Sequence, residues 1–320
     1  MAKSYLLPKA SKQFKSNLHA HTIHSDGALT PQQMKALYQE HGYHIIAYTD
    51  HNVLNYFKEL DEENFLALCG YEVDAYTQNS YGGFEKTCHL NLIARNPQTA
   101  KFIEKPAIYS VDSINDTIEK LYQANYIIHY NHPGWSAEEP ADYLNLNHIS
   151  AMEIYNHGCE VETNDGDARN HYDIILKHGL HWNCISTDDN HNHNTLPNNT
   201  LRTETDSCGG YTMICAPTLT YDSVIQALDD GNYYCCMGEG APEIYHYYIE
   251  DSKLVIDCSP VKGVFVKSNS IGARFHRTST TDSITHAEFD LTTLRGDEPY
   301  LRIELADSKR RMTFTNPYYL

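Results

Sequence analysis

The side chains best suited to chemistry in this chain are imidazoles and carboxylates at short spacings. His19 and His21 are two residues apart, Asp26 lies within Ser-Asp-Gly, and His51 ends Thr-Asp-His. Imidazole and carboxylate groups are ligands that suit Zn, Mn or Fe. Alternate residues of a β-strand point to one face, so we expect His19 and His21 to lie on a strand and reach one ion. This spacing predicts the beginning of a metal-dependent hydrolase site.

Further segments supply the same kinds of side chain along the next 140 residues. A carboxylate ends Gly-Tyr-Glu, an imidazole lies in Cys-His-Leu-Asn, another precedes a proline, and an Asp and a His alternate in Asp-Asp-Asn-His. Most of the 19 histidines precede residue 200, which localises the predicted chemistry to the first two thirds of the chain. The additional predicted ligands are Glu72, His89, His132, Asp189 and His191.

Two of these ligands have a neighbour that competes for the same role. His129 alternates into an apolar run, whereas His132 follows that run and precedes a proline, so we favour His132. Asp188 competes with Asp189, and the Asp-x-His spacing to His191 favours Asp189.

Residues near the predicted ligands are interpreted as substrate contacts, with proton transfer or simple solvation as the alternatives for the two histidines among them. These are His24, Trp135, His193 and Arg95. A phosphate group is best held by Arg or Lys. The other cations near the motifs are Lys101, Lys105, Arg169 and Arg202.

Short apolar runs alternate with helical patterns over the first 230 residues, which favours βα units and a mainly parallel sheet. Thr30 is the expected N-cap of a helix that begins at Pro31, with Gln33 completing a capping box, and ends at His41-Gly42. The ends of the strands in a βα barrel converge on one rim, so distant ligands are expected to form one cluster. Strands are expected at Ser16–His21, His44–Thr49, Leu66–Val73, Cys88–Arg95, Tyr126–Tyr130, Ala151–Tyr155, His181–Thr187 and Tyr211–Cys215, and further helices at Val111–Ala124, Gly166–His178 and Tyr221–Asp229.

The pattern changes after Gly238–Pro242, where helical periodicity ends and alternating β pattern begins. We therefore expect a metallohydrolase domain at residues 1–238 and a small antiparallel β-sandwich at residues 239–320. The strands expected in the second domain are Ile244–Ile249, Lys253–Asp257, Val264–Lys267, Ala287–Leu291, Tyr300–Leu305 and Met312–Thr315.

The ordered motifs resemble the polymerase-and-histidinol-phosphatase (PHP) superfamily of metal-dependent phosphoesterases. H-x-H-x-x-x-S-D-G, T-D-H, G-x-E, a strand His, His-Pro and a late D-x-H occur in that order over residues 16–237. The resemblance implies an α/β fold, a distorted (β/α)7 barrel, with two or three divalent ions. The ligands it implies are His19, His21, Asp26, His51, Glu72, His89, His132, Asp189 and His191. The C-terminal segments, with Tyr-Leu-Arg-Ile-Glu and Thr-Asn-Pro, resemble the carbaryl-hydrolase-like branch.

The chemistry that this resemblance implies is hydrolysis by a metal-bridging hydroxide, since two bound ions lower the pKa of a shared water. No protein nucleophile and no covalent intermediate are expected. We expect a phosphoesterase that acts on a small phosphorylated metabolite or nucleotide. The alternative is a carboxyl-ester or carbamate hydrolase using the same cluster, and a metal-bearing binding module without turnover is the third class.

Composition restricts the partners. With 24 Lys and Arg against 42 Asp and Glu, the net charge is −18, which argues against binding to a nucleic-acid duplex. A small anionic ester remains compatible, because bound cations reverse the local field. No apolar run is long enough for a membrane span, and we expect a cytoplasmic protein whose oligomeric state the sequence leaves open. The nine cysteines include no C-x-x-C and are expected to be reduced and buried.

Overall fold

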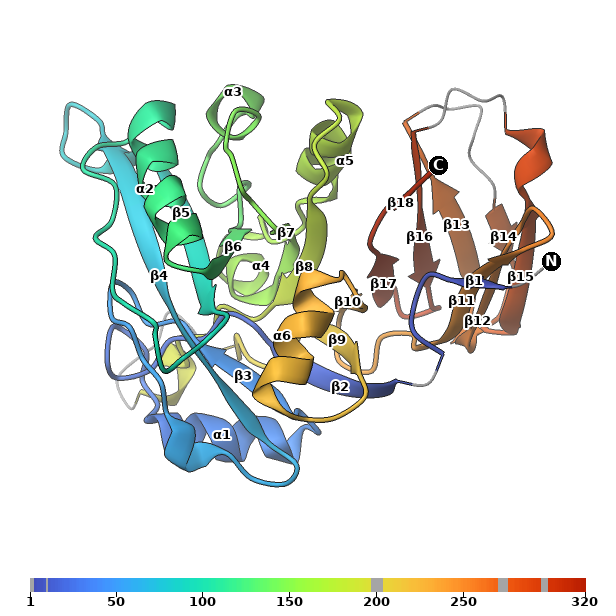
Figure 1. The fold of residues 1–320 in the computed structure, drawn as a ribbon, viewed down its shortest axis with the longest axis horizontal. Coiled ribbons are helices and arrows are strands. Elements are labelled where there is room, and N and C mark those ends of the chain that lie inside the picture. The colour runs from blue at the N-terminus through green and yellow to red at the C-terminus, as the bar shows by residue number, and fades with distance from the viewer. Residues whose placement is uncertain (1–2, 10, 197–203, 270–275, 295–298) are drawn as a thin grey trace.

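The computed structural model describes residues 3–9, 11–196, 204–269, 276–294 and 299–320. Figure 1 shows two bodies side by side, a strongly curved sheet covered by helices and a β-sandwich beside which both chain ends lie. Across these described ranges, no helix combines the length and apolar character that crossing a bilayer would require.

Most predicted elements are present, with shifted ends. The strands of the first body are β2 (Lys12–Asn17), β3 (Ile45–Tyr48), β4 (Leu66–Gln78), β5 (Phe84–Ala94), β6 (Tyr126–Tyr130), β7 (Ala151–Asn156), β8 (Asn183–Thr187), β9 (Gly210–Ala216) and β10 (Tyr233–Met237). The helices are α1 (Pro31–Glu40), α2 (Val111–Gln123), α3 (Pro140–Tyr143), α4 (His157–Thr163), α5 (Arg169–Lys177) and α6 (Tyr221–Asp229), with single 3-10 turns at Lys58–Leu60, His193–Thr195 and Leu291–Thr293.

Helix α1 begins as its sequence predicts. The Thr30 side chain accepts a hydrogen bond from the Gln33 amide, and the Gln33 side chain accepts one from the Thr30 amide, so the capping box is confirmed. The helix ends before Gly42, whose φ of +75° lies in the left-handed region that favours glycine.

The main sheet is mixed rather than mainly parallel. Strands β2, β3 and β4 are parallel to one another, as are β6, β7 and β8, but β5 runs antiparallel to both β4 and β6. No helix separates β4 from β5, because the Asn79 side chain and Gly82 close a tight turn between them. The expected alternation of strand and helix is therefore broken at this hairpin.

The sheet curls until β8 lies next to β9, but the pairing does not show the predicted closed (β/α)7 barrel. In the described residues β8 forms a backbone ladder with β7, and its link to β9 is a side-chain bridge in which Thr212 Oγ1 bonds both the amide and the carbonyl of Ser186. Alternate residues of the curled strands still share one apolar interior, which α6 covers at one end (Figure 1). The interior includes Leu18, Ile45, Leu68, Ile127, Ile185 and Ile214.

The C-terminal strands pair antiparallel, as expected. They are β11 (Ile244–Glu250), β12 (Lys253–Val261), β13 (Gly263–Lys267), β14 (His276–Thr278), β15 (Ile284–Asp290), β16 (Tyr300–Ala306), β17 (Met312–Thr315) and β18 (Tyr318–Tyr319). One layer has the order β1-β11-β12-β15, where β1 (Ser4–Tyr5) comes from the start of the chain. The other layer, β14-β13-β16-β17, continues through β17 into β10 of the main sheet.

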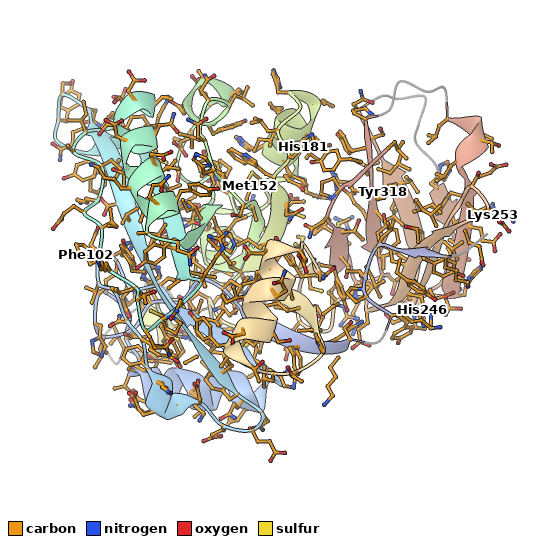
Figure 2. The ribbon with its side chains drawn as sticks, viewed as in Figure 1. Phe102, Met152, His181, His246, Lys253 and Tyr318 are labelled. Carbon is orange, nitrogen blue, oxygen red and sulfur yellow. The ribbon has the colours of Figure 1, made fainter. Side chains whose placement is uncertain are left out.

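The two bodies are thus joined by a shared sheet and by side-chain packing. His181 and Tyr318 lie at their junction (Figure 2), where the His181 ring stacks on the ring of Tyr319 at 4.0 Å between centroids. The division at residues 238/239 remains a prediction, and β1 is an N-terminal segment that adds to the C-terminal layer.

Candidate metal centre

The His-x-His pair lies just beyond the end of a strand, and not within it as the sequence predicted. Strand β2 ends at Asn17, because from Leu18 onward the backbone bonds residues of two different loops: the Ala20 amide donates to Thr49 Oγ1 and the His21 amide to the Asn190 carbonyl. The segment stays extended, so His19 and His21 still point in one direction and are fully buried.

Glu72 of β4 is the first carboxylate at the centre of the cluster. Its Oε1 is 3.0 Å from His89 Nδ1 and its Oε2 is 3.0 Å from His51 Nδ1. The Nε2 atoms of His19 and His21 lie 3.3 and 3.4 Å from the same carboxylate. Glu72 is completely buried, and because His132 Nε2 also lies 3.8 Å from Oε1, five imidazoles converge on one acid.

Asp189 is the second central carboxylate. Its Oδ1 lies 3.0 Å from the Nε2 atoms of both His19 and His21, and its Oδ2 lies 3.7 Å from His132 Nε2. The residue has a φ of +51°, a left-handed conformation that turns the chain sharply after β8. This turn directs the side chain back toward the His-x-His pair.

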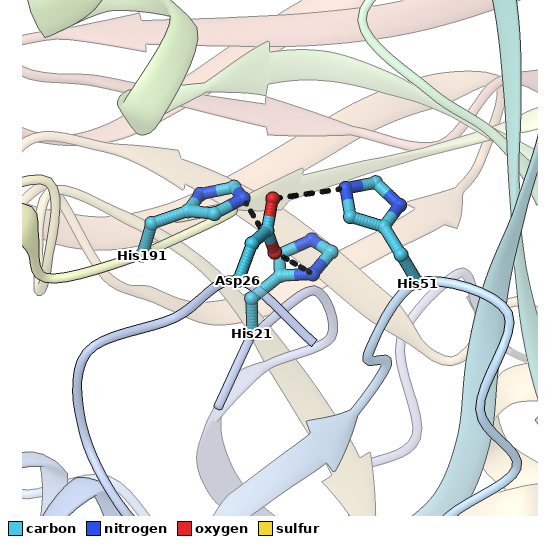
Figure 3. A group of neighbouring side chains, drawn as sticks. All are labelled: His21, Asp26, His51 and His191. Carbon is cyan, nitrogen blue, oxygen red and sulfur yellow. Dashed lines mark ion pairs between the residues drawn. The ribbon is translucent and has the colours of Figure 1, made fainter. Parts of the chain in front are cut away.

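Asp26 faces three imidazoles at the outer side of the cluster, those of His21 and His51 again and that of His191 (Figure 3). Its carboxylate oxygens lie 3.7 Å from His21 Nδ1, 3.7 Å from His51 Nε2 and 3.4 Å from His191 Nε2. The loop that carries Asp26 is closed at Gly27, where a Cβ atom would meet the His21 carbonyl oxygen at 2.2 Å. A glycine is therefore required at this position of the Ser-Asp-Gly motif.

Asp50 and Asp188, which adjoin predicted ligands, support the backbone. Asp50 accepts hydrogen bonds from the Thr22 amide and hydroxyl and from Ser25 Oγ, which fixes the loop before Asp26. Asp188 accepts from the backbone amides of residues 208, 209 and 210. Of the two adjacent acids, Asp189 is the one that faces the imidazoles.

His129 is buried in β6 but belongs to none of the groups of ligand atoms that converge in the described residues. Burial lowers the pKa of His129 to about 4, so its ring is neutral. His132, at a φ of +22°, turns into the cluster, and its Nδ1 is held by Ser136 Oγ at 3.0 Å.

The charges of the cluster depend on one another. Burial opposes ionisation of Glu72 and Asp189, but the surrounding imidazoles outweigh it and hold the pKa of each acid well below its usual range. Burial likewise opposes protonation of His51, yet Glu72 raises the pKa of His51 to about 9. Burial, with His191 and His51 nearby, lowers the pKa of His21 to about 3.

The residues present fit divalent ions. The described residues form four groups, and within each group one ligand atom from every residue lies within 4.8 Å of the others. The Nε2 atoms of His19 and His21 are 3.0 Å apart and face the same Asp189 oxygen, while His21 Nδ1 is buried without a hydrogen-bond partner in the described structure. A cation would satisfy such convergent lone pairs. The groups are His21/Asp26/His51/His191, His19/His21/Glu72, His51/Glu72/His89 and His132/Cys159/Asp189.

All nine predicted ligands are therefore brought together, and two residues that the sequence analysis did not assign join them. Glu153 of β7 accepts from His19 Nδ1 at 2.7 Å and from the His132 amide at 3.1 Å. Cys159 of α4 lies with its Sγ 4.0 Å from Asp189 Oδ2. An acid inside the apolar run Ala-Met-Glu-Ile-Tyr was the available signal for Glu153, whereas no spacing indicates Cys159. The nine cysteines are all free and buried, as expected.

A cavity of about 660 Å³ opens above the cluster. Of the residues predicted to contact substrate, Trp135 and His193 line it, and His24 and Arg95 do not; substrate contact by the first two stays a prediction. His24 packs against Phe57, and the Arg95 guanidinium is held by Asp229, with its Nη2 2.8 Å from Oδ1.

The other Lys and Arg residues considered as phosphate-binding residues either lie away from the cavity lining or fall outside the described residues. Lys101 does not line the cavity, Lys105 pairs with Asp74 at 2.8 Å, and Arg169 pairs with Asp167. Arg202 lies outside the described residues.

Comparison with known proteins places this geometry in context. Residues 17–145 match the sequence model of the PHP domain, a stretch that holds seven of the nine clustered ligands, from His19 to His132. No curated protein matches the chain in sequence. A two-domain protein from Bacteroides vulgatus, described as containing a predicted PHP-like metal-dependent phosphoesterase, is similar with a TM-score of 0.50 and 13% identity, over 100% of this chain and 98% of that chain.

A second solved structure is less similar. An amidohydrolase from Chromobacterium violaceum, solved with bound sulfate and no metal, matches with a TM-score of 0.38 and 15% identity over 55% of this chain and 87% of that chain. The comparison with the Bacteroides vulgatus protein shows that the present chain shares a two-domain fold with it.

Proposed function

We propose that this protein is a metal-dependent hydrolase, and specifically a phosphoesterase that acts on a small phosphorylated molecule. The observation that carries the proposal is the convergence of nine imidazole and carboxylate side chains, with Glu72 and Asp189 at their centre, at the floor of an open cavity. The match of residues 17–145 to the PHP domain model supports it. Membership of the carbaryl-hydrolase-like branch and a cytoplasmic location stay predictions.

The clustered residues would hold two or three divalent ions of the Zn, Mn or Fe type. Such ions supply Lewis acidity toward a phosphoryl or carbonyl oxygen and make a water acidic near neutral pH. The protein itself orients the ligands: Glu153 fixes the Nδ1 side of His19, and Ser136 fixes that of His132, so each ring presents its Nε2 inward. The burial of both His19 and Glu72 keeps bulk water from the inner ligands.

The test is hydrolysis by chelator-treated protein resupplied with Mn²⁺, Zn²⁺ or Fe²⁺. We expect turnover of p-nitrophenyl phosphate or bis-p-nitrophenyl phosphate that requires the added ion. Glu72→Gln should lower the rate by at least about 100-fold, since even outer-shell partners of a metal cost 10- to 100-fold. The exposed Asp230→Asn serves as the control.

The competing function is hydrolysis of carboxyl esters or carbamates by the same cluster. Hydrolysis of p-nitrophenyl acetate but of neither phosphate ester would contradict the phosphoesterase assignment and favour this alternative. Absence of turnover with all three esters, in protein shown to contain metal, would favour a binding module.

A further inference from the structure

Cys159 differs from the other cysteines in the position of its thiol. Among the described residues, which include all nine cysteines, Cys159 is the only cysteine that lines the cavity and belongs to a group of converging ligand atoms. Its side chain is buried, and its Sγ lies 4.0 Å from Asp189 Oδ2. Buried cysteines usually act as small apolar side chains, and that role does not account for a thiol beside a carboxylate and an imidazole.

The start of α4 brings this thiol to the cluster. Gly158 approaches the loop after β8 so closely that a Cβ atom on it would lie 2.8 Å from the carbonyl oxygens of both Asp188 and Asp189. The Asn156 side chain accepts a hydrogen bond from the Cys159 amide at 2.9 Å and donates one to Asp189 Oδ2 at 3.1 Å. The first turn of the helix and the acid are therefore held together, with Cys159 directly after the close contact.

His132 is the third member of the group, and its ring directs one nitrogen at the same point. The residue is buried, and its Nδ1 is held by Ser136 Oγ at 3.0 Å. Its Nε2 lies 3.7 Å from Asp189 Oδ2 and 3.8 Å from Glu72 Oε1. Both separations are longer than a hydrogen bond, so this buried nitrogen faces two acids without bonding to either.

These separations fit ligands that share one ion. Metal bonds of about 2.0 to 2.3 Å place two ligand atoms of a tetrahedral Zn²⁺ about 3.3 to 3.7 Å apart. Asp189 Oδ2 is 3.7 Å from His132 Nε2 and 4.0 Å from Cys159 Sγ, close to that range. All three residues line the cavity, as expected for an ion with three protein ligands and a fourth position open to water or substrate.

From this arrangement we propose that Cys159 is a tenth ligand of the centre and makes the position it shares with His132 and Asp189 selective for a thiophilic ion, Zn²⁺ rather than Mn²⁺. The inference rests on the proposed function, which requires divalent ions at this cluster. When the ion binds, a sulfur–metal bond replaces the S–H bond and the proton passes to solvent. Thiolate is a soft ligand that favours Zn²⁺, whereas carboxylate and water suit Mn²⁺.

The test detects the sulfur–metal bond by absorption spectroscopy of chelator-treated protein titrated with Co²⁺. A thiolate bound to Co²⁺ gives an intense charge-transfer band in the near ultraviolet, which imidazole and carboxylate ligands do not give. We expect this band in the wild-type protein and its loss in Cys159→Ser. Cys258→Ser, in β12 of the sandwich, is the matched control and should keep the band.

Competition with a chromophoric chelator measures the selectivity. Cys159→Ser should weaken Zn²⁺ binding by about 10-fold or more and leave Mn²⁺ binding nearly unchanged, because only the soft ion loses a preferred ligand. Alkylation of the wild-type protein by iodoacetamide, followed by peptide mass spectrometry, adds a measurement that needs no variant. Zn²⁺ should protect Cys159 more than Mn²⁺ does.

The inference is overturned if bound Co²⁺ gives no charge-transfer band in the wild-type protein, or if the band persists in Cys159→Ser that circular dichroism shows to be folded. Equal protection of Cys159 by the two ions would also overturn it. If no ester is hydrolysed while the band and its loss are both observed, the proposed function is wrong and the sulfur ligand stands, since the spectrum is recorded without turnover.

Discussion

At the scale of single residues, the cluster depends on groups that touch the ligands from outside. Glu153 is completely buried, and its Oε1 accepts from His19 Nδ1 and from Thr187 Oγ1 at 2.6 Å. These bonds leave the Nε2 atom of His19 turned toward Asp189, at 3.0 Å from its Oδ1. Glu153 is thus a positioning residue whose effect reaches the cluster through His19.

Glu153→Gln should weaken metal binding by about 10- to 100-fold, because an amide orients the His19 ring less firmly than a carboxylate does. Competition with a chromophoric chelator measures this affinity directly. The exposed Glu119→Gln provides the matched control, and circular dichroism checks that the variant is folded. Wild-type affinity in the folded Glu153→Gln protein would contradict the role assigned to this acid.

At the scale of elements, the segment between β6 and α3 carries both His132 and Trp135. It is held at its far end by Glu138, which is 4% exposed and accepts hydrogen bonds from the hydroxyls of Tyr130 and Tyr109. Burial outweighs these bonds and raises the pKa of Glu138 from 4.5 to about 7. The segment is therefore fixed by a carboxyl group that is partly protonated at neutral pH.

This pKa predicts how stability changes with pH. Between pH 4.5 and about 7 the folded protein holds a proton on Glu138 that the unfolded chain has lost, so the free energy of unfolding falls as pH rises through this window. The loss amounts to about 3 kcal/mol above pH 7. In chelator-treated protein, Glu138→Gln should remove this part of the slope.

Denaturant titrations at pH 5 and pH 8 measure the effect, with the exposed Glu63→Gln as control. The prediction fails if Glu138→Gln and Glu63→Gln lose the same free energy between the two pH values.

At the scale of the whole molecule, an ion pair made by a buried arginine connects the sandwich to the curled sheet. Arg302 of β16 is completely buried and donates to Asp173 of α5 at 2.6 Å and to Glu304 at 2.7 Å. The pairing of β17 with β10 continues the same connection through the backbone. Both bodies are therefore expected to unfold as one unit.

Arg302→Ala should lower the free energy of unfolding by about 3 kcal/mol, because it removes the closest cation from the buried Glu304 and from the partly buried Asp173. A thermal scan should show a lower midpoint with a single transition. Arg310→Ala, at an exposed position, should keep the wild-type midpoint. Equal midpoints for the two variants would show that the buried pair does not fasten the two bodies.

The sequence by itself determined the local features. The capping box of α1 and most strand positions follow from residue type and spacing, since these properties act over a few residues. The set of nine clustered side chains follows from short motifs together with their resemblance to the PHP superfamily. The choice of His132 over His129 and of Asp189 over Asp188 also rested on short spacing, and the structure brings the chosen residues to the cluster.

Only the tertiary structure decided how these parts meet. The antiparallel pairing of β4 with β5, the side-chain contact between β8 and β9, and the addition of β1 to the C-terminal layer depend on which strands meet in the fold. Glu153 and Cys159 join the cluster for the same reason. Arg95 does not line the cavity, because its guanidinium forms an ion pair with Asp229. Several of these contacts, such as those of Glu153 with His19 and of Arg95 with Asp229, join residues 134 positions apart, where spacing along the chain carries no information about distance in space.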